Sequence, residues 1–547
     1  MLINGWKFCM KNVFQIGSFI CVAFLLAACG GGDSSPSSSG ESFVTISGLV
    51  TYTSYKPNKV VGLDYGASQE KPIQGAVIEL QNFSGNVLAT GNTTTIGAYT
   101  LMAPANTFVR VVVKAALGNP SAPHTKIVDN TSDGALYAMA MTLTTGSSDV
   151  IQSFNANSGW GGAGYTGLRV AAPFAILGAI YQAQQLVLAV DSEVSFPPLQ
   201  VNWSVYNKAA SGDVTLGEIE TSHYALNGQL YILGAANLDT DEYDSHIIVH
   251  EWGHYFEDKL SRSESNGGNH GYGDILDPTV AFSEGFSNAL AGMAMNDPIY
   301  IDTSGFHQAG VGHSINLETD SVSETSRYNE GVLLDGFYAE ASIEEVIYDI
   351  YDSGLADDDS IGLGFLPIYN VLINGQKHTP AFTSVFSFLH YLKLANPASS
   401  AAITDLALAE NISEGDEYEA TTSRFYTSIP FDGSIVSLDI DGDPLQTWGT
   451  FGEITPSSPG NKFYNRLFFK FTATSAGCYT FMASPILEDG DIIVYSPKYP
   501  DIDKFNKGPA ESAARQYTLG EKGVFAVGSF GGETPFTVRV YSTPSAC

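Results

Sequence analysis

The sequence predicts a multidomain protein in which one α+β domain lies between two β-sandwiches. Short alternating apolar runs, separated by Gly, Asn and Pro, fill residues 43–117, and similar runs return in residues 431–547. Between them, residues 118–430 carry longer apolar patterns at helical spacing. With 547 residues, 44% of them hydrophobic, the chain is long enough for about three domains.

The first 28 residues predict an export signal. Lys7 and Lys11 are their only charged residues, and an apolar run ends in the sequence LAAC at Cys29. Small residues before a cysteine are typical of lipoprotein signal peptides, so Cys29 is expected to become the lipidated N-terminus. A plain secretory signal or an N-terminal membrane helix is the alternative. Residues 29–42 then read as a Gly/Ser tether.

The residue after Cys29 is Gly30, and this resembles the pattern of outer-membrane lipoproteins. We therefore expect a protein of the cell envelope or cell surface, held to a lipid bilayer by its N-terminal anchor. Once the signal is removed and Cys29 carries lipid, Cys478 and Cys547 are the remaining cysteines. An exported protein meets oxidising conditions, so these two are predicted to form a disulfide, with two free thiols as the alternative.

Acidic residues greatly outnumber basic ones. The chain has 58 Asp and Glu against 25 Lys and Arg, a net charge of −33, which becomes −35 when Lys7 and Lys11 leave with the signal. Such a charge excludes nucleic acid as a partner. Because the acidic residues are spread along the chain, they indicate a solvated surface that keeps an exported protein soluble.

Residues 43–117 carry nothing that looks catalytic. The order of their apolar runs resembles the small transthyretin-like domains found beside carboxypeptidases, which implies a spacer or adhesion module. Residues 173–190 form an uncharged run that is long enough to be a candidate membrane-spanning helix. Three glutamines near its middle favour a buried core helix instead.

Residues 244–260, DSHIIVHEWGHYFEDKL, contain an HExxH motif. Apolar residues recur there at helical spacing after possible capping residues, so we place the motif on a helix. At about 100° per residue, His250 and His254 lie one turn apart on one face and can both reach a metal ion about 2.0–2.1 Å away. Glu251 lies beside that pair without competing as a ligand. The alternative is two ordinary histidines on a helix.

This arrangement indicates hydrolysis with Zn²⁺ as the cofactor. Zinc that is held by neutral imidazoles and keeps one open position lowers the pKa of its bound water from about 15.7 to roughly 7. Glu251 can then take the proton as general base and return it to a leaving amine as general acid.

Two histidines do not complete a zinc site, so a third ligand must follow. The pattern with a further histidine six residues after the second is excluded, because that position holds Leu260. The remaining candidates are His270, Asp274, Asp277 and Glu284.

Glu284 is the strongest of these candidates. It lies in the run at residues 279–295, which is apolar, rich in alanine and periodic like a buried helix. A carboxylate in an apolar helix needs a partner, and a metal ion is one. Asn288, one turn further on, could hold a ligating histidine from behind, although it could also be an ordinary polar residue at the helix edge.

HExxH on one helix, followed by Glu284 and Asn288 on the next, resembles the gluzincin zinc peptidases, of which thermolysin is the familiar member. The resemblance covers residues 171–394 and implies a zincin-like α+β catalytic domain with His250, His254 and Glu284 as the zinc ligands. Two features depart from thermolysin: the gap between His254 and Glu284 is longer, and Asn288 replaces an aspartate.

The resemblance also implies a group that stabilises the transition state. Residues 336–343, GFYAEASI, resemble the thermolysin-like segment that carries a histidine for this purpose, and Tyr338 takes its place here. A phenol can donate a hydrogen bond to a developing oxyanion. Tyr348 and His313 are the alternatives.

The strands expected at residues 222–226 and 229–233 come just before the zinc helix, and in gluzincins an edge strand there pairs with the extended substrate. Helical patterns follow at residues 341–352 and 381–394. Two acidic groups suggest Ca²⁺ or else solvated loops: Asp357, Asp358 and Asp359, and Asp439, Asp441 and Asp443. Residues 431–547 resemble the C-terminal domains of secreted bacterial peptidases, which bind surfaces or polymers.

The sequence therefore predicts an exported, lipid-anchored zinc metallopeptidase that acts on peptide or protein substrates. Two other functions remain open. One is a surface-binding lipoprotein whose zinc site is structural or silent. The other is a zinc hydrolase that acts on a different acyl bond.

Overall fold

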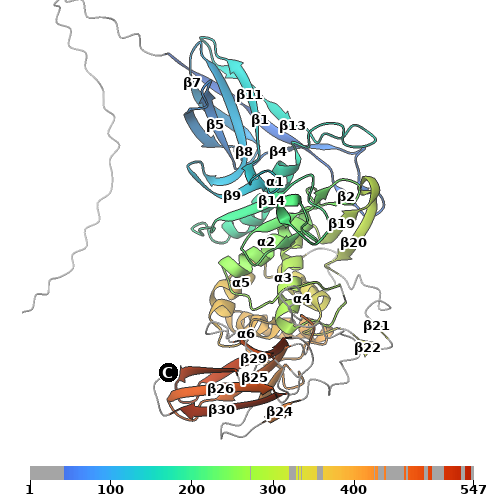
Figure 1. Ribbon diagram of the computed structural model, residues 1–547, viewed down its shortest axis with the longest axis vertical. Coiled ribbons are helices and arrows are strands. Elements are labelled where there is room, and N and C mark those ends of the chain that lie inside the picture. The colour runs from blue at the N-terminus through green and yellow to red at the C-terminus, as the bar shows by residue number, and fades with distance from the viewer. Residues whose placement is uncertain are drawn as a thin grey trace, which may run out of the picture. The chain divides into compact units, whose positions relative to one another are not determined.

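The computed structural model describes residues 42–271, 273–318, 328–329, 332–333, 335–353, 361–423, 425–428, 436–438, 461–463, 466–485, 491–495, 511–530, 536–543 and 547 (Figure 1). Several predictions concern residues outside these ranges: the export signal, lipidation of Cys29, the tether, and calcium binding by Asp357 to Asp359 or by Asp439, Asp441 and Asp443.

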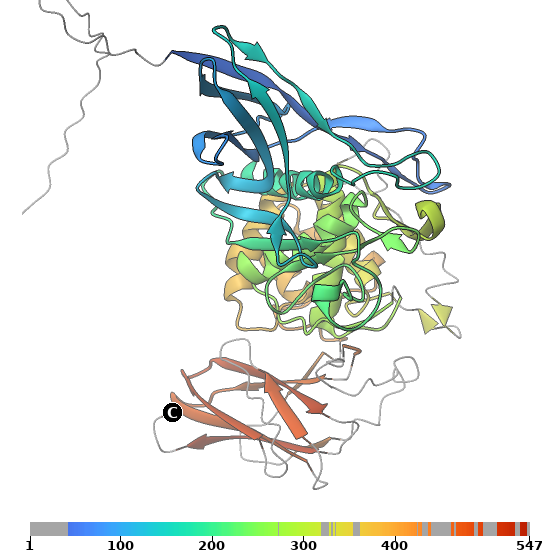
Figure 2. The ribbon, with the colours of Figure 1, turned by 45° about the horizontal axis from the view of Figure 1, so that its top comes forward.

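Two sheets form the N-terminal β-structure, shown in blue and cyan in Figures 1 and 2. Around β1 (Phe43–Ser54), the first sheet gathers β4 (Gln69–Pro72), β7 (Ala98–Pro104), β12 (Val150–Ile151) and β13 (Phe154–Ala156). The second sheet has nine strands. Seven follow the order β15-β16-β14-β9-β8-β5-β6, which continues into the region expected to be catalytic, while β10 pairs with β9 and β11 pairs with β8. Their bounds are β5 Ala76–Asn82, β6 Val87–Asn92, β8 Phe108–Asn119, β9 Ala122–Asp129, β10 Ala135–Leu136, β11 Ala138–Thr144, β14 Leu199–Trp203, β15 His223–Tyr224 and β16 Leu230–Ile232.

The structure does not divide at the predicted boundary between residues 117 and 118. Strand β8 runs across it, and β9 pairs antiparallel with β8 and parallel with β14. One hydrophobic core cluster also continues from Val44 through the helix with the HExxH motif and on to Ala526. The N-terminal strands and the helical region therefore share a core, which an independent sandwich ending at residue 117 would not.

Helix α1 (Ala172–Leu188) corresponds to the uncharged run at residues 173–190, and Pro173 lies at its start. Most of its side chains are buried, including Gln184, which bonds Thr125. The prediction of a core helix is thus confirmed. Among the residues that the structure describes, no helix is both long and apolar enough to cross a bilayer.

The HExxH motif lies on α2 (Ser245–Lys259), which packs against α3 (Pro278–Met295). Two glycines allow the close approach of α3 to its neighbours. A Cβ at Gly253 would lie 2.6 Å from Ser287 Oγ, and one at Gly285 would lie 2.7 Å from the Glu340 carbonyl oxygen. Larger side chains at these positions would push the helices apart.

Helices α4 (Glu340–Tyr351), α5 (Phe365–Asn370), α6 (Val385–Ala395) and α7 (Ser400–Ala409) complete the helical layer, and α4 packs on α3. A π-helical segment, residues 371–376, joins α5 to α6. A four-stranded sheet lies beside α2, and its strands are β17 (Gly234–Ala235), β18 (Asp239–Thr240), β19 (Ile299–Ser304) and β20 (Gly310–Asn316). Two small hairpins are β2 (Pro57–Asn58) with β3 (Gly62–Leu63), and β21 (Tyr328–Asn329) with β22 (Val332–Leu333).

The C-terminal strands form two four-stranded sheets (Figure 2). A smaller core cluster lies within them, while Phe468, Val524 and Ala526 belong to the large cluster of the helical region. One sheet has the order β23-β25-β29-β27, and the other has the order β24-β30-β26-β28. Their bounds are β23 Tyr426–Ser428, β24 Val436–Leu438, β25 Arg466–Thr472, β26 Gly477–Pro485, β27 Asp491–Tyr495, β28 Glu511–Tyr517, β29 Lys522–Phe530 and β30 Phe536–Thr543. A disulfide joins Cys478 to Cys547. Since β23 already pairs with β25, this sheet begins a few residues before position 431.

Candidate metal centre

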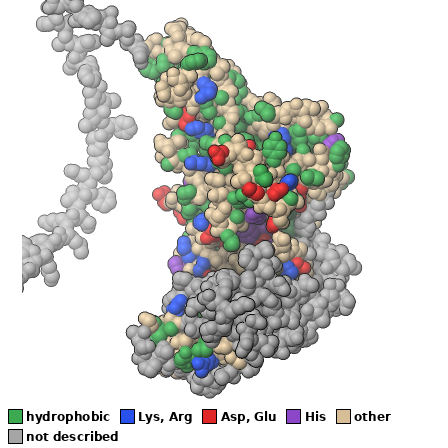
Figure 3. All heavy atoms as spheres, in the orientation of Figure 1, with side chains coloured by type: hydrophobic (Ala, Val, Ile, Leu, Met, Phe, Trp, Pro, Cys, Tyr) green, Lys and Arg blue, Asp and Glu red, His purple; other side chains and the backbone are tan. Residues whose placement is uncertain are grey.

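Three donor atoms from two neighbouring helices meet beside the HExxH motif. His250 Nε2 and His254 Nε2 on α2 are 3.2 Å apart. Glu284 Oε2 on α3 lies 3.1 Å from the first nitrogen and 3.3 Å from the second. Figure 3 shows histidine side chains near the middle of one face of the molecule, with acidic side chains beside them.

The size of this triangle fits a zinc ion. With bonds of about 2.0–2.1 Å and tetrahedral angles, two zinc ligands lie about 3.3 Å from each other. The three observed separations of 3.1, 3.2 and 3.3 Å match that value. The sequence-predicted ligands His250, His254 and Glu284 therefore come together as a set.

The other ring nitrogens are occupied, and this determines which nitrogens can bind a metal. His250 Nδ1 is 2.6 Å from the Asn288 side-chain oxygen, which can only accept a hydrogen bond. His254 Nδ1 is 3.0 Å from Ser283 Oγ. When both Nδ1 atoms carry the proton, both Nε2 atoms turn lone pairs toward the Glu284 carboxylate. A cation shared by these three electron-rich atoms, either a proton or a metal ion, satisfies that arrangement.

A second layer of buried groups holds the histidines in place. The Asn288 amide donates to Glu344 Oε2 at 2.7 Å, and the Glu344 side chain lies on α4 with 0% exposure. Behind His254, the Ser283 hydroxyl donates to the buried carboxylate of Glu257. Each imidazole is thus oriented by a hydroxyl or amide that itself contacts a carboxylate.

Replacing Asn288 by Ala is expected to weaken zinc binding by about 10–100-fold, because His250 loses the acceptor that fixes its tautomer and ring angle. Competition with a chromogenic chelator measures this change in zinc affinity. Asn86→Ala, at an exposed turn between β5 and β6, is the control and should bind zinc like the wild type. Equal zinc affinity in all three chains would contradict the orienting role.

Glu251 points to the edge of the nine-stranded sheet. Its Oε2 accepts the backbone N–H of Tyr224, on the end strand β15, at 2.7 Å. The side chain is 8% exposed. It is also close enough to His254 for its charge to help raise the pKa of that histidine. Glu251 thus lies between the three-residue cluster and the end strand of the nine-stranded sheet.

The cluster is strongly polarised. Burial on its own would raise the pKa of Glu284, but His254, His270 and two histidine hydrogen bonds outweigh it, so that the pKa lies well below the usual value. Burial likewise opposes the charged form of His254, yet Glu284 and Glu257 raise its pKa well above normal. The carboxylate of Glu284 is therefore kept ionised, as a metal ligand must be.

His270 is the one loop candidate that reaches this cluster. Its Nε2 lies 3.7 Å from Glu284 Oε2 and 3.3 Å from Glu340 Oε2. Asp274 instead pairs with Lys462 at 2.9 Å. Asp277 caps α3 by accepting from Thr279 N–H, and it also pairs with the buried Arg466. Those two carboxylates are thus engaged elsewhere.

Tyr338 has other described contacts. Its hydroxyl is 3.4 Å from the Asp335 carbonyl oxygen, and its ring stacks on Phe463. Of its alternatives, Tyr348 is buried beside Tyr351, and His313 lies in β20 opposite Asp302. None of these described contacts joins a transition-state donor to the cluster of His250, His254 and Glu284.

Sequence reasoning missed Ser283, Glu257 and Glu344. Glu257 follows His254 by three residues, so the helical period could have shown that it faces the same side of α2. Glu344 lies on a different helix, and only the packing of α4 on α3 brings it to Asn288. Asp244 and Ser245 were the possible capping residues of the predicted helix. Asp244 lies at the N-cap position of α2, but its carboxylate accepts from Thr303 instead of capping the helix.

Comparison with known proteins gives one family match. The model of the Mycolysin C-terminal domain matches residues 200–361, which include α2, α3 and α4. No curated protein matches the chain.

Among solved structures, the chain is similar to the pre-peptidase C-terminal domain of a collagenase from Bacillus anthracis. The identity is 10%, the match covers 22% of this chain and 99% of that one, and the TM-score is 0.15, too low to indicate a shared fold. The family match alone supports a thermolysin-like peptidase context for the segment that holds the candidate metal centre.

Proposed function

We propose that this chain is an exported, lipid-anchored peptidase that depends on zinc. The observation that carries the proposal is the triangle formed by His250, His254 and Glu284, whose sides match the ligand spacing of tetrahedral zinc. The peptidase context of residues 200–361 supports it. We assign Cys29 as the lipid anchor on its sequence pattern.

When zinc is bound by these three residues, it supplies Lewis acidity that acidifies water and polarises a carbonyl group. Glu251 takes the proton of the attacking water and delivers it to the departing amine. Its hydrogen bond from Tyr224 N–H holds the carboxylate beside the strand edge while it does so.

Substrate binding is assigned to β15. This strand ends the nine-stranded sheet, so one of its edges has no partner strand among the described residues. An extended peptide can add to such an edge through backbone hydrogen bonds, which recognise many sequences. The contact between Tyr224 and Glu251 supports this assignment, because a peptide added to β15 would lie next to the proposed base.

Two residues compete for the role of oxyanion donor. The family resemblance favours Tyr338, whereas position favours His270, whose Nε2 reaches to 3.7 Å from Glu284. The Tyr338 hydroxyl lies instead near the carbonyl oxygen of Asp335. We therefore favour His270 for this role. The C-terminal sandwich is assigned to binding of surfaces or polymers.

Removal of the metal tests the proposed function. Treating the purified mature chain with 1,10-phenanthroline should lower casein cleavage by at least about 100-fold, since polarisation by the metal is lost. One equivalent of zinc should restore the activity. The isomer 1,7-phenanthroline, which cannot chelate, is the matched control.

Cleavage that survives chelation would contradict a zinc peptidase. A zinc-loaded chain that cleaves esters but no peptides would instead favour a hydrolase for another acyl bond. A zinc-loaded chain that cleaves neither would favour a surface-binding lipoprotein with a structural zinc.

A further inference from the structure

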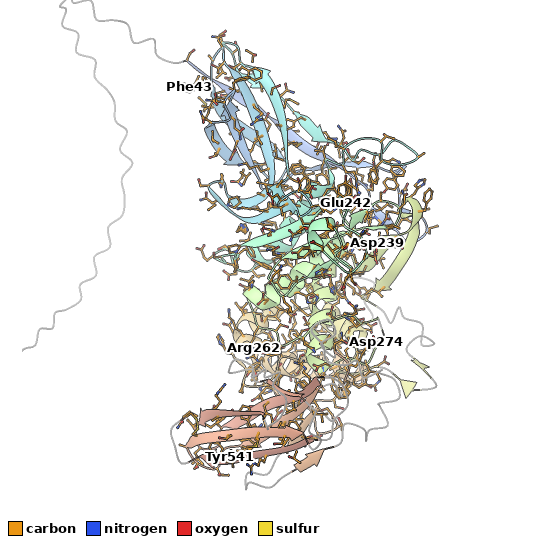
Figure 4. All side chains as sticks on the ribbon, viewed as in Figure 1. Phe43, Asp239, Glu242, Arg262, Asp274 and Tyr541 are labelled. Carbon is orange, nitrogen blue, oxygen red and sulfur yellow. A yellow bond between two sulfur atoms is a disulfide. The ribbon has the colours of Figure 1, made fainter. Side chains whose placement is uncertain are left out.

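A second cluster of oxygen atoms lies apart from the zinc triangle. Oxygens of Asp239 on β18, Asp241 just after it and Asp302 on β19 lie within 4.8 Å of one another. Strand pairing brings them together, because β18 pairs with β19 and a β-bulge at Asp302 and Thr303 redirects the second strand. Figure 4 labels Asp239 beside β19 and β20. A fourth carboxylate, Asp244, is fully buried behind them.

No basic side chain within the described ranges forms an ion pair with these four carboxylates. The nearby guanidinium of Arg169 is engaged by Glu242, and it also donates to Thr240 Oγ1 and the Gly234 carbonyl oxygen. Glu242 therefore has a buried counter-charge, whereas its neighbours Asp241 and Asp244 do not. Buried charge without compensation is expensive, so this contrast needs an explanation.

Several buried carboxylate oxygens of this cluster accept no hydrogen bond from a described residue. Asp241 is 3% exposed, and its Oδ2 accepts from the Ser222 hydroxyl while its Oδ1 has no described partner. Asp244 accepts from Thr303 N–H at 2.9 Å through Oδ2, and its Oδ1 is likewise buried without a described partner.

Gln308 gives an independent indication, because it is a neutral side chain. It is 1% exposed, and its amide nitrogen donates to the Thr303 carbonyl oxygen at 2.8 Å. The same amide lies against the Asp239 carboxyl. Its carbonyl oxygen Oε1 is buried and accepts no hydrogen bond from any described residue. A buried, unsatisfied amide oxygen on a side chain whose nitrogen contacts Asp239 points to a cation, which would attract the amide oxygen and the carboxylates alike.

The pKa values of the clustered carboxyls are consistent with a site for a cation. Burial and the neighbouring charge of Asp239 raise the pKa of Asp302 to about 7. Burial, followed by the charges of Asp239 and Asp302, raises the pKa of Asp241 well above its usual value. Without a counter-charge these carboxyls hold protons, and a bound divalent cation would displace them.

We propose that Asp239, Asp241 and Asp302 bind a calcium ion, with the oxygens of Gln308 and Asp244 in support. All donors are hard oxygens, without the nitrogen or sulfur that zinc prefers. Calcium binds oxygen at about 2.3–2.6 Å, so it can touch oxygens up to about 5 Å apart, whereas magnesium needs a tighter shell. Asp239 and Asp302 are half-buried, which leaves the site accessible to an ion from solvent.

This site is connected to the candidate metal centre through two strands. Ser222, whose hydroxyl bonds Asp241, also accepts from Leu233 N–H at 2.9 Å and immediately precedes β15. On β19, Tyr300 lies two residues from Asp302, and its ring is 6.4 Å from that of His250. Bound calcium would therefore fix β15 and β19 against α2.

Calcium binding to the zinc-loaded mature chain tests the proposal by equilibrium dialysis and thermal melting. The double variant Asp239→Asn/Asp302→Asn should bind one calcium ion fewer per chain, or bind it at least about 100-fold more weakly. Saturating calcium should raise the wild-type melting temperature by at least about 3 °C, and should raise that of the variant less. Asp133→Asn/Asp405→Asn, which removes the same charge from exposed positions, should behave like the wild type.

Two features keep the test decisive. Because the double variant removes buried carboxyls that repel one another whenever they ionise, it should melt no lower than the wild type in calcium-free buffer. A failure to fold would therefore itself count against the proposal. Repeating the dialysis in a Glu251→Gln chain separates calcium binding from peptidase activity. Equal calcium binding by wild type and double variant would overturn the site, and a preference for magnesium would overturn the assignment to calcium.

Discussion

Glu251→Gln is expected to lower kcat for peptide hydrolysis by about 10²–10⁴-fold while zinc content and fold stay unchanged. A glutamine side-chain oxygen can still accept the hydrogen bond that Tyr224 N–H now gives to Glu251, so β15 keeps its place. The amide cannot take a proton from water at neutral pH, however. Steady-state cleavage of a fluorogenic peptide, with zinc measured by mass spectrometry on the same sample, gives both values.

The leaving group provides a sharper test of the same residue. An amine must be protonated as it departs, whereas the phenol or alcohol of an activated ester departs as a stable anion. The Glu251→Gln chain should therefore lose more activity on the amide than on an activated ester of the same acyl group. Glu193→Gln, an exposed carboxylate on a different segment, should leave both rates unchanged. If the Glu251→Gln chain cleaves the peptide at the wild-type rate, another group is the base.

Local periodicity was sufficient to predict the helices of the metal centre. The apolar spacing at residues 244–260 predicts a helix almost coincident with α2, and one turn of helix places His250 and His254 together. The argument for Glu284 was energetic, since a carboxylate in an apolar helix needs a partner. Its side chain is 5% exposed, and its described partners are histidines.

Pairing between distant strands could not be predicted in this way. The predicted boundary between residues 117 and 118 does not coincide with a division of the structure, because β9 pairs in parallel with β14 across a long connection. The alternation of residues within β9 does not identify its partner strand. The acidic cluster was missed for a similar reason. Sequence inspection found carboxylates that are adjacent along the chain, whereas Asp239 and Asp302 become neighbours only through the pairing of β18 with β19.

Glu284→Ala is expected to weaken zinc binding by more than the roughly 10–100-fold loss expected when an outer partner such as Asn288 is replaced. Peptide cleavage should fall in proportion to the zinc that is lost. Alanine leaves two imidazole nitrogens 3.2 Å apart without the anion that completes their set. It also removes the negative charge that raises the pKa of His254, so protons no longer compete as strongly for that nitrogen. The loss of zinc must therefore come from the missing ligand, and metal analysis after dialysis measures it.

Glu340→Gln is the matched control, because it too alters a buried glutamate that contacts His270 but it is not part of the triangle. It should retain one zinc ion per chain. If Glu284→Ala also retains zinc, then another group completes the site, and His270, 3.7 Å from the Glu284 carboxylate, is the first to examine by a second substitution. If zinc is lost from Glu284→Ala but kept in Glu340→Gln, the third ligand is the carboxylate on α3, and the fourth position remains available for water and substrate.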